Sequence, residues 1–494
     1  MIKKIVIVGG GTAGWMSAAI LKKVLADNVS IQLIESDSIA PVGVGEATIP
    51  PIQHVNRVLG LDEAEFLRET KATLKLAIRF ENWRVPGESY FHTFGAPGKS
   101  IAFCHFHHLW LRAQKQGLAE DMWQYDLNYL AAKENKFAKI NTQDPNLEMP
   151  YAYHFDATAY AAYLRKKSEQ MGVTRTEGLI NKATINPHTG DIDSVALDNG
   201  EIIEGDLFID CSGFRGLLIQ RHLNTGYEDW SHWLPCDRAI AVPSERLEQT
   251  LPYTRSIAHA GGWQWRIPLQ HRNGNGLVYS SAHYSEDEAT HVLMSNLDSK
   301  PLAEPRVIAF KTGRARKQWN KNVIAVGLAS GFIEPLESTS IHLIQAAIVR
   351  LLKLFPHDGI NPADRDEFNK QSQTEYEQIR DFIILHYHVN QRKDDIFWRQ
   401  LKDMDIPASL AHKIELFKAK GTIVREQEDL FAEASWLQVM MGQGITPNDY
   451  HPIANNLPQH QLEDWLKAVQ QAKAAPVANM PSHDDFIAMF CGTK

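Results

Sequence analysis

The sequence predicts an α/β fold: a Rossmann-type sheet, a mixed β region in the middle of the chain and a mainly helical C-terminal part. Three observations predict it. The chain opens with an apolar strand, a glycine-rich turn, an amphipathic helix and a second strand. Two later apolar segments also end in glycine turns, and helical periodicity dominates from about Gln345 onward.

The individual elements follow from periodicity and turn residues. At the start we expect strands at Ile5–Val8 and Ser30–Glu35 around a helix at Ala13–Ala26. In the middle we expect a helix at Ala157–Met171 and strands at Ile192–Leu197, Leu207–Ile209 and Val323–Val326. The C-terminal part predicts helices at Ala346–Leu354, Glu375–His386 and Gln461–Gln471, and a loose tail marked by Pro476 and Pro481.

Composition narrows the function classes. The net charge of −8 argues against nucleic-acid binding, which favours a basic surface. No apolar stretch is long enough to span a bilayer. The apolar start, Met1–Val8, runs into three glycines without a cleavage pattern, so it predicts a first strand rather than a signal peptide. Four scattered cysteines suit a reducing compartment without a disulfide or zinc framework, which predicts a cytoplasmic location.

The first glycine turn predicts a dinucleotide site. Gly9, Gly11 and Gly14 fit G-x-G-x-x-G, with Thr12 and Ala13 between the last two glycines. Glycine allows the tight turn, lets a pyrophosphate approach the backbone and packs helix against strand. The helix start supplies N–H groups and a positive dipole end. Glu35 ends the second strand, where a carboxylate binds ribose hydroxyls.

FAD is favoured over NAD as the dinucleotide. The loop Gly43–Pro50 follows the second strand, where it could cover a flavin. The segments Gly205–Gly213 and Val323–Gly331 repeat the style of a strand followed by a glycine turn. Each could be a structural turn by itself. Three such elements in one sheet suit a long, bent cofactor.

Several motifs together resemble the flavin-dependent tryptophan halogenase family. The most specific is W-x-W-x-I-P at Trp263–Pro268, which stands beside Gly9–Trp15, Gly43–Pro50, Thr73–Lys75 and Glu337–Ser340. The resemblance runs over nearly the whole chain. It implies a flavin monooxygenase-like FAD module over residues 1–345, with inserted substrate-region segments, and a helical part over 346–494 that completes the substrate pocket. It also implies cofactor contacts from Ala47, Leu328 and Ile341.

The resemblance implies a reaction and residues that carry it out. Reduced FAD (FADH2) comes from a separate NAD(P)H-dependent flavin reductase and reacts with O2, and chloride or bromide becomes hypohalous acid. That oxidant reaches a lysine beside an aromatic substrate, where it reacts as a hydrogen-bonded hypohalous acid or as an N-halo-lysine. The implied residues are the catalytic pair Lys75 and Glu337, the halide-binding backbone of Thr339 and Ser340, and a barrier between flavin and substrate formed by Trp263, Trp265, Ile267 and Pro268.

The residues themselves leave alternatives open. Lys75 lies among apolar residues on a strand-like segment, where an inward ammonium can donate to an oxyacid and its amine form is nucleophilic. Alternation could instead point it outward. Glu337 can stabilise a cationic arene and accept its proton. Glu334 competes for that role, although its position before Pro335 suits a turn. Glu337 could also serve as an N-cap partner for a helix at Ile341–Leu354, a role that better suits Ser338 or Thr339.

The substrate-pocket residues are expected from the same resemblance. They are Phe103 and His105, with Trp436 either stacking on the substrate ring or belonging to the core. The run Cys104–Trp110 contains three histidines, but His105 and His107 alternate like strand or turn residues without a further ligand at metal spacing, so no metal site is expected. His386 and His388 fall in a helical pattern.

The chain departs from the tryptophan-specific members at two places. Ser340 stands where those members have glycine, which changes the halide site. Thr422–Met441 is too short for the lid that holds free tryptophan. An indole, another electron-rich aromatic or a peptide-bound tryptophan is therefore expected, and a homodimer is compatible with the resemblance. The competing interpretations are an FAD-dependent aromatic monooxygenase (hydroxylase) and a non-catalytic flavin-binding protein.

Overall fold

The computed structural model describes residues 2–39, 45–426 and 429–492. The chain forms two compact units that interleave along the sequence. The first unit comprises Met1–Ala72, Phe155–Ala239 and Val307–Glu377, and the second comprises Thr73–His154, Ile240–Arg306 and Gln378–Lys494. The division into an FAD module up to residue 345 and a helical part after it stays a prediction, because the two compact units are defined by how the chain packs and not by what each part binds.

The first unit is built on a six-stranded sheet with the order β20-β21-β12-β1-β2-β8. The strands are β1 (Lys4–Val8), β2 (Ser30–Glu35), β8 (Thr174–Glu177), β12 (Leu207–Asp210), β20 (Trp319–Asn320) and β21 (Val323–Ala325). All neighbours pair in parallel except β20 and β21. Ile7 stands between Leu33 and Ile209, and all three are fully buried. The predicted α/β class with a Rossmann-type sheet is confirmed.

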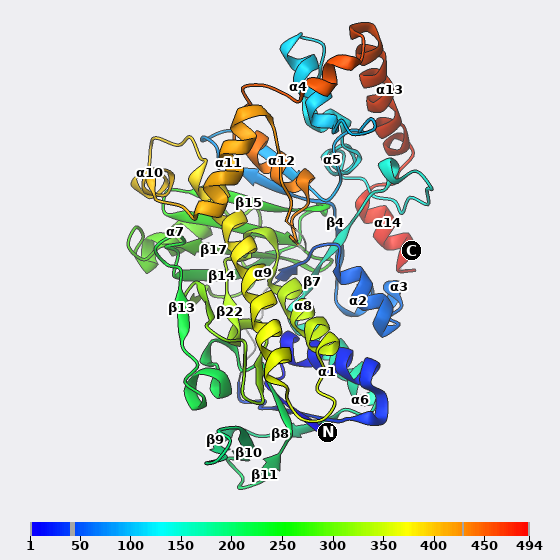
Figure 1. Ribbon diagram of the computed structural model, residues 1–494. Helices are drawn as coiled ribbons and strands as arrows, with labels where there is room; N and C mark the ends of the chain where they lie inside the picture. The colour runs from blue at the N-terminus through cyan, green and yellow to red at the C-terminus, as the bar shows by residue number, and fades with distance from the viewer. Residues whose placement is uncertain (1, 40–44, 427–428, 493–494) are drawn as a thin grey trace. The chain divides into compact units, whose positions relative to one another are not determined.

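Helices and small sheets complete the first unit. Helix α1 (Thr12–Leu25) packs against α6 (Ala157–Gln170) and α8 (Ser340–Lys353) (Figure 1). The short helices are α2 (Ile52–Leu59) and α3 (Glu63–Glu69), and β3 spans Gly45–Ala47. One three-stranded sheet contains β9 (Ile180–Ile185), β10 (Ile192–Leu197) and β11 (Ile202–Glu204), and another contains β13 (Tyr227–Asp229), β19 (Gly313–Ala315) and β22 (Gly331–Phe332).

The second unit is built on mixed β structure. It contributes the strand order β14-β17-β16-β15-β5-β6 to a seven-stranded sheet whose further edge strand is β18, and β15 and β5 are parallel. The strands are β5 (Ala77–Glu81), β6 (Ser89–Thr93), β14 (Arg238–Glu245), β15 (Tyr253–His259), β16 (Gly262–Pro268) and β17 (Arg272–Tyr279), with β18 at Arg306–Ala309. Separately, the three-residue strand β4 (Thr73–Lys75) pairs antiparallel with β7 (Ala152–Asp156).

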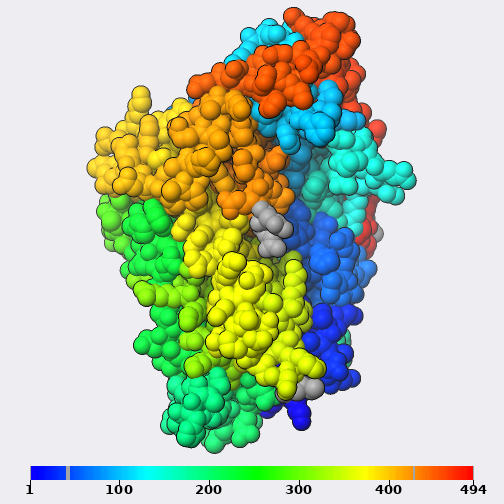
Figure 2. Space-filling model, in the orientation of Figure 1, coloured from blue at the N-terminus to red at the C-terminus, as the bar shows by residue number. Residues whose placement is uncertain are grey.

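Helices form much of the rest of the second unit. They are α4 (Phe106–Lys115), α5 (Leu127–Lys133), α7 (Glu286–Ser295), α10 (Ile396–Asp403), α11 (Ala408–Lys420), α12 (Glu433–Gly442), α13 (Gln459–Ala478) and α14 (His483–Phe490). Helix α9 (Pro362–His388) continues across the boundary between the units and includes His386 and His388, as predicted. Figure 2 shows α10 and α11, in amber, at the surface. None of the helices in the described part of the chain has both the length and the apolar character of a membrane span.

The prediction of a loose C-terminal tail is wrong. Pro476 lies inside α13, and a further helix, α14, follows Pro481. Proline at this position removes one backbone hydrogen bond from the last turn of α13, and α13 ends two residues later. Burial explains the order: Val477, His483 and Ile487 are 3%, 1% and 6% exposed. Proline marked a break between two helices rather than the end of structure.

Candidate active site

The glycine-rich turn between β1 and α1 has the geometry of a dinucleotide-binding turn. At Gly9, φ is +107° and a Cβ would overlap the carbonyl oxygen of Cys211. A Cβ at Gly14 would overlap the carbonyl oxygen of Gly9, so only glycine lets the helix approach the strand this closely. A Cβ at Gly11, by contrast, would meet nothing within 4 Å. Space is therefore open beside Gly11.

Helix α1 starts at this open space without a cap. Gly11 is the N-cap residue, and in the described part of the chain no side chain caps the N–H groups of the first turn, which contains no acidic residue. The N–H groups of the first turn, which include those of Thr12 and Ala13, and the positive end of the helix dipole are thus available to an anion. An uncapped helix start beside a glycine cradle fits the pyrophosphate of FAD.

Glu35 borders the same turn. A Cβ on Gly10 would overlap its Oε2, so this oxygen lies directly against the glycine turn. Its Oε1 accepts a hydrogen bond from Arg175 at 2.6 Å and a longer one from Arg165 at 3.4 Å. Oε2 accepts only a long bond from the Trp15 indole at 3.3 Å among the described contacts. Oε2 is therefore the oxygen best placed to accept from a ribose hydroxyl.

The three predicted strand–turn elements converge, as the sequence suggested. The turn after β12 supplies the Cys211 carbonyl that lies against Gly9. In the turn after β21, Gly327 has φ +67°, and a Cβ there would lie 2.8 Å from the Cβ of Ala13. Leu328 is half-buried in that turn, and Ile341 is buried in the first turn of α8. The carboxyl ends of three neighbouring strands thus meet at the start of α1.

The predicted loop Gly43–Pro50 is described from Gly45 onward, and its first two residues lie outside the described residues. Ala47 ends β3 and is 7% exposed. Burial raises the pKa of its neighbour Glu46 to about 7. Glu46 was not among the residues expected from the sequence. A lone carboxyl between the small residues of this loop was the feature that could have indicated it. A carboxyl that titrates near neutrality is a candidate proton carrier.

The start of α8 forms a second anion-binding geometry. Ser338 is left-handed, with φ +60°, and Thr339 is helical, a sequence of conformations that turns successive N–H groups toward one side. The side chain of Thr339 does not cap α8, and among the described residues its buried Oγ1 meets no hydrogen-bond partner. Glu337, just before this turn, is 2% exposed, and Ser340 is half-buried. A buried hydroxyl donor beside an uncapped helix start suits a small anion.

In the second unit, Lys75 ends strand β4 and is fully buried. This rules out the outward orientation left open by the sequence. In the pairing with β7, Thr73 stands opposite His154 and Lys75 opposite Ala152, so Thr73 and Lys75 share one face of the strand. The ammonium nitrogen of Lys75 lies 5.2 Å from the centre of the Phe94 ring. Phe94, which is half-buried, was missed by sequence analysis.

Thr73 joins two of the motifs that sequence analysis singled out. Its hydroxyl donates to the carbonyl oxygen of Pro268 at 2.7 Å and lies 3.0 Å from His154 Nδ1. Since the single hydroxyl proton is used at Pro268, His154 donates from Nδ1, and its Nε2 accepts from Thr254 at 2.9 Å. Burial and the positive charge of Lys75 hold the pKa of His154 well below its usual 6.5. A neutral histidine therefore lies close to the charged lysine.

Strand β16 carries the W-x-W-x-I-P motif with its apolar residues on one face. Trp263 and Trp265 are 1% and 8% exposed, with ring centres 6.2 Å apart. Trp83 lies 6.3 Å from Trp263 on the same side. A Cβ at Gly276 on β17 would overlap the Trp265 ring, so a glycine makes room for the indole. Ile267 is also buried. The result is a rigid aromatic wall that excludes water.

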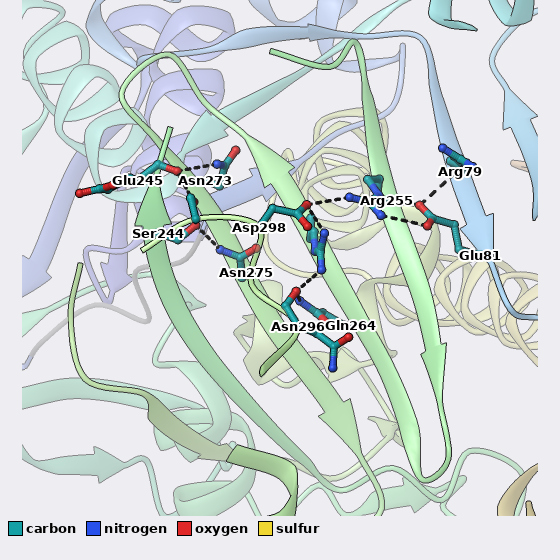
Figure 3. A network of polar contacts seen from close by, with 12 residues as sticks. Arg79, Glu81, Ser244, Glu245, Arg255, Gln264, Asn273, Asn275, Asn296 and Asp298 are labelled. Carbon is teal, nitrogen blue, oxygen red and sulfur yellow. Dashed lines mark hydrogen bonds and ion pairs between the residues drawn. The ribbon is translucent and has the colours of Figure 1, made fainter. Parts of the chain in front are cut away.

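The intervening residues of the motif belong to a polar network (Figure 3). Arg255 binds both oxygens of Glu81, at 2.6 and 2.9 Å, and Asp298 at 2.7 Å. Arg266 of the motif also bonds Asp298. Further along, Asn275 donates to the Ser244 hydroxyl at 2.9 Å. Period-two alternation thus separates the aromatic wall from an ion-pair network that fixes the strands.

The three predicted substrate residues differ in exposure. Phe103 is 91% exposed and follows Ala102, which is left-handed with φ +48°. Nδ1 of His105 lies 3.3 Å from a carboxylate oxygen of Glu433. Trp436 is fully buried, 4.9 Å from the Phe382 ring, which is the core position that the sequence left open. Their contact with a substrate stays a prediction, whereas Phe94 is the aromatic ring that the structure places beside Lys75.

The expectation of a strand or turn for the histidine run is wrong. His105 is the N-cap residue of α4, and His107 lies within that helix. The pattern misled because α4 is buried on more than one face. Phe106, Leu109 and Trp110 share one face, and His107, His108 and Leu111 on the other side are buried as well. A helix buried on several faces loses the period that sequence analysis uses. In the described residues, no cluster of histidine, cysteine and carboxylate side chains suits a metal ion.

Comparison with known proteins identifies the family. A family model described as tryptophan halogenase matches residues 4–459. The chain belongs to the tryptophan halogenase family. The tryptophan 7-halogenase RebH of Lentzea aerocolonigenes is 33% identical, and the alignment covers 98% of each chain. Two solved structures, Xcc4156 from Xanthomonas campestris and BrvH from Brevundimonas sp. BAL3, both flavin-dependent halogenases, are 48% and 43% identical, with TM-scores of 0.97 and 0.96 over 99% of each chain. The chain is thus a flavin-dependent halogenase.

Gly11 and Gly14 allow a direct test of the flavin site, because an added methyl group meets open space at one and backbone at the other. We predict that Gly11→Ala leaves the melting temperature unchanged but weakens FAD binding by roughly tenfold, about 1.4 kcal/mol, because the new methyl occupies only the cradle. Gly14→Ala is predicted to lower both the melting temperature and the affinity for FAD, since its methyl group overlaps the backbone of Gly9. Thermal unfolding and fluorescence titration with FAD measure the two effects. Unaltered FAD affinity in Gly11→Ala would contradict this site.

Buried neutral histidines in the second unit predict acid sensitivity. Burial lowers the pKa of His483 to about 4, whereas the unfolded chain has the usual 6.5. The unfolded state therefore binds more protons between pH 6.5 and 4, and stability falls as pH falls through that window. At pH 5 this histidine alone lowers the free energy of unfolding by about 2 kcal/mol relative to pH 7. Urea unfolding at both pH values measures this, and His483→Gln should lose that part of the difference.

Proposed function

We propose that this enzyme uses FADH2, O2 and chloride or bromide to halogenate an indole-like or other electron-rich aromatic compound. The observation that carries the proposal is the buried Lys75, held beside the Phe94 ring on a strand tied to the W-x-W-x-I-P motif. Burying an ammonium costs free energy, because a charge is better solvated by water than by the protein interior. Family membership supplies the reaction class in which this lysine is proposed to act.

The flavin is proposed to bind at the turn of the first unit. Gly9, Gly11 and Gly14 with the start of α1 hold the pyrophosphate, and Glu35 accepts from the ribose. Ala47, Leu328 and Ile341 are the proposed further contacts. When reduced FAD is bound, it supplies the electrons with which O2 converts halide to hypohalous acid. In this proposal a separate NAD(P)H-dependent reductase delivers the reduced flavin.

The halide is proposed to bind at the start of α8. The N–H groups of Thr339 and Ser340 and the Thr339 hydroxyl are its donors, supported by the uncapped helix and the unpartnered Oγ1. An anion at this end of a 14-residue helix also gains from the dipole. The half-buried Ser340 side chain adds bulk and a polar group beside this position, so the choice between chloride and bromide is decided here.

Lys75 is proposed to activate the oxidant. Its ammonium donates a hydrogen bond to the oxygen of hypohalous acid, which weakens the oxygen–halogen bond. The ring carbon forms a bond to the halogen as the oxygen–halogen bond breaks, and the oxygen leaves as water after taking a proton from the Lys75 ammonium, which regains a proton when the site is reset. The ring then loses its own proton to the carboxylate of Glu337, which restores aromaticity. The halogen is reduced and the arene is oxidised.

The aromatic wall supports halogenation over hydroxylation. Trp263 and Trp265 are nearly inaccessible and rigidly packed, and we propose that they and the adjoining Ile267 and Pro268 keep the substrate away from the flavin. Oxygen transfer to the ring is then impossible, and the oxidant passes through halide. This distinguishes the proposal from an FAD-dependent hydroxylase and from a silent flavin-binding protein.

Free tryptophan is not the proposed substrate. The alignment with RebH spans 528 positions, more than the 494 residues of this chain, so that tryptophan halogenase carries segments without a counterpart here. This agrees with the short Thr422–Met441 stretch. An indole or a similar ring without a clamped amino-acid group fits a site that has fewer covering residues, and a peptide-bound tryptophan is the second candidate.

The test combines purified protein with a flavin reductase, NADH, FAD, O2 and indole, in bromide and in chloride. We predict a mono-halogenated indole by mass spectrometry and no product without halide. Lys75→Ala is predicted to lower product formation by at least a hundredfold, because the group that polarises the oxidant is lost, while FAD affinity stays unchanged.

The exposed Lys71, four residues away, provides the control: Lys71→Ala should retain full activity. Hydroxylated product alone, or no product from a panel of indoles, phenols and tryptophan-containing peptides, would refute the halogenase proposal. Full activity of Lys75→Ala would refute the role of this lysine.

A further inference from the structure

The C-terminal helix α14 reaches the strand that carries Lys75. The N–H group of Leu74, the residue before Lys75, donates to Nε2 of His483 at 3.1 Å. The other ring nitrogen, Nδ1, lies 2.8 Å from the carbonyl oxygen of Thr250. A carbonyl can only accept, so Nδ1 carries the proton and Nε2 is the acceptor for Leu74. The contact spans 409 residues of sequence.

This bond replaces a missing strand partner. Strand β4 has only three residues and pairs with β7 on one side. On the other side, the buried N–H of Leu74 needs an acceptor, because an unpaired buried donor costs about 1–3 kcal/mol. His483 supplies that acceptor with a rigid ring. The side chain is 1% exposed, so no water competes.

Helix α14 is itself firmly seated. The N–H of His483 donates to the carbonyl of Asn135 at 2.8 Å. The neighbouring Asp484 accepts from the Thr250 N–H at 2.9 Å and from Arg246 at 2.6 Å. Phe486 packs edge-on against Phe137 with ring centres 4.8 Å apart. The acceptor nitrogen of His483 is thus fixed in place by contacts from several segments.

We propose that His483 is a positioning residue for Lys75. This rests on the proposed role of Lys75. The imidazole of His483 fixes the backbone at Leu74. The side chain of Thr73 is fixed by Pro268 and His154. The two residues that precede Lys75 are therefore both held in place. Since its backbone cannot shift, the ammonium of Lys75 keeps one direction, and the oxidant meets it in a productive geometry. The C-terminal helix is therefore part of the active site and not an accessory.

The test uses two substitutions of similar size and polarity. In His483→Gln the amide oxygen can take the place of Nε2 and accept from Leu74, whereas in His483→Asn the amide nitrogen can reach only the Thr250 carbonyl. Met489→Ala, at an exposed position of the same helix, is the control. Each variant is assayed as full-length enzyme for flavin reoxidation, halogenated indole, and free hypohalous acid captured by a thiol scavenger.

We expect His483→Asn to form at least tenfold less halogenated product per flavin oxidised, with the scavenger capturing the difference, and His483→Gln to recover most of the coupling. Flavin reoxidation should not change. Hydrogen exchange of a peptide covering residues 73–76 should be faster in His483→Asn alone. Equal coupling in both variants and the wild type would overturn the proposal.

Lys75→Ala separates the two possible failures. If Lys75→Ala keeps its product yield, the proposed role of Lys75 is wrong. If Lys75→Ala loses product while His483→Asn keeps wild-type coupling, only the positioning role of His483 is wrong. A purely structural role would instead lower thermal stability in both His483 variants without changing product per flavin.

Discussion

The hydrogen bond from the Thr73 hydroxyl to the Pro268 carbonyl joins the strand of Lys75 to the strand of the two tryptophans. A fully buried lysine on a three-residue strand is an unstable arrangement by itself, since burial of the charge is unfavourable and three residues make few ladder bonds. The strand is therefore fixed by its neighbours. Thr73 is held by Pro268 and His154, and the ring of Phe94 lies beside the ammonium.

The buried histidines in the surroundings of Lys75 add no further positive charge. His154 and His483 are both buried and both neutral, each with one nitrogen donating and the other accepting. Protonating either would add a second positive charge near Lys75 in a medium that screens poorly. The histidines thus act as rigid two-ended hydrogen-bond connectors. In the proposed mechanism, the ammonium then polarises the oxidant without competition from a second charged group.

In the first unit, the glycine turn is fixed by the close approach of backbone segments rather than by side-chain hydrogen bonds. Overlap of any Cβ at Gly9 or Gly14 with a carbonyl oxygen fixes the turn, and the empty space at Gly11 leaves room for a phosphate. The first strand, the glycine turn, the helix and the second strand are consecutive in sequence, which is why the α/β class with its Rossmann-type sheet could be predicted. The cofactor contacts of the glycine motif and of Glu35 stay predictions. The buried position of Lys75 was also suggested by its apolar neighbours.

The parts that could not be predicted depend on contacts between distant segments. His483 bonds Leu74 across 409 residues, and nothing in its own neighbourhood indicates a role. Phe94 was passed over for Phe103 because both lie in aromatic segments and only the fold decides which ring meets the lysine. The helix at the histidine run was missed because burial on several faces removed the periodic signal. The order of the C-terminal tail was missed because Pro476 and Pro481 suggested an end of regular structure, whereas one lies inside α13 and the other precedes α14.

Replacing the Thr73 hydroxyl tests the central claim most directly. Thr73→Val keeps the branched shape of the side chain but removes both the donor to Pro268 and the acceptor for His154. For Thr73→Val we predict that FAD affinity and flavin reoxidation stay unchanged, whereas the amount of halogenated indole in the same assay falls by at least tenfold. A Thr73→Val enzyme that halogenates indole at the wild-type rate would contradict this claim.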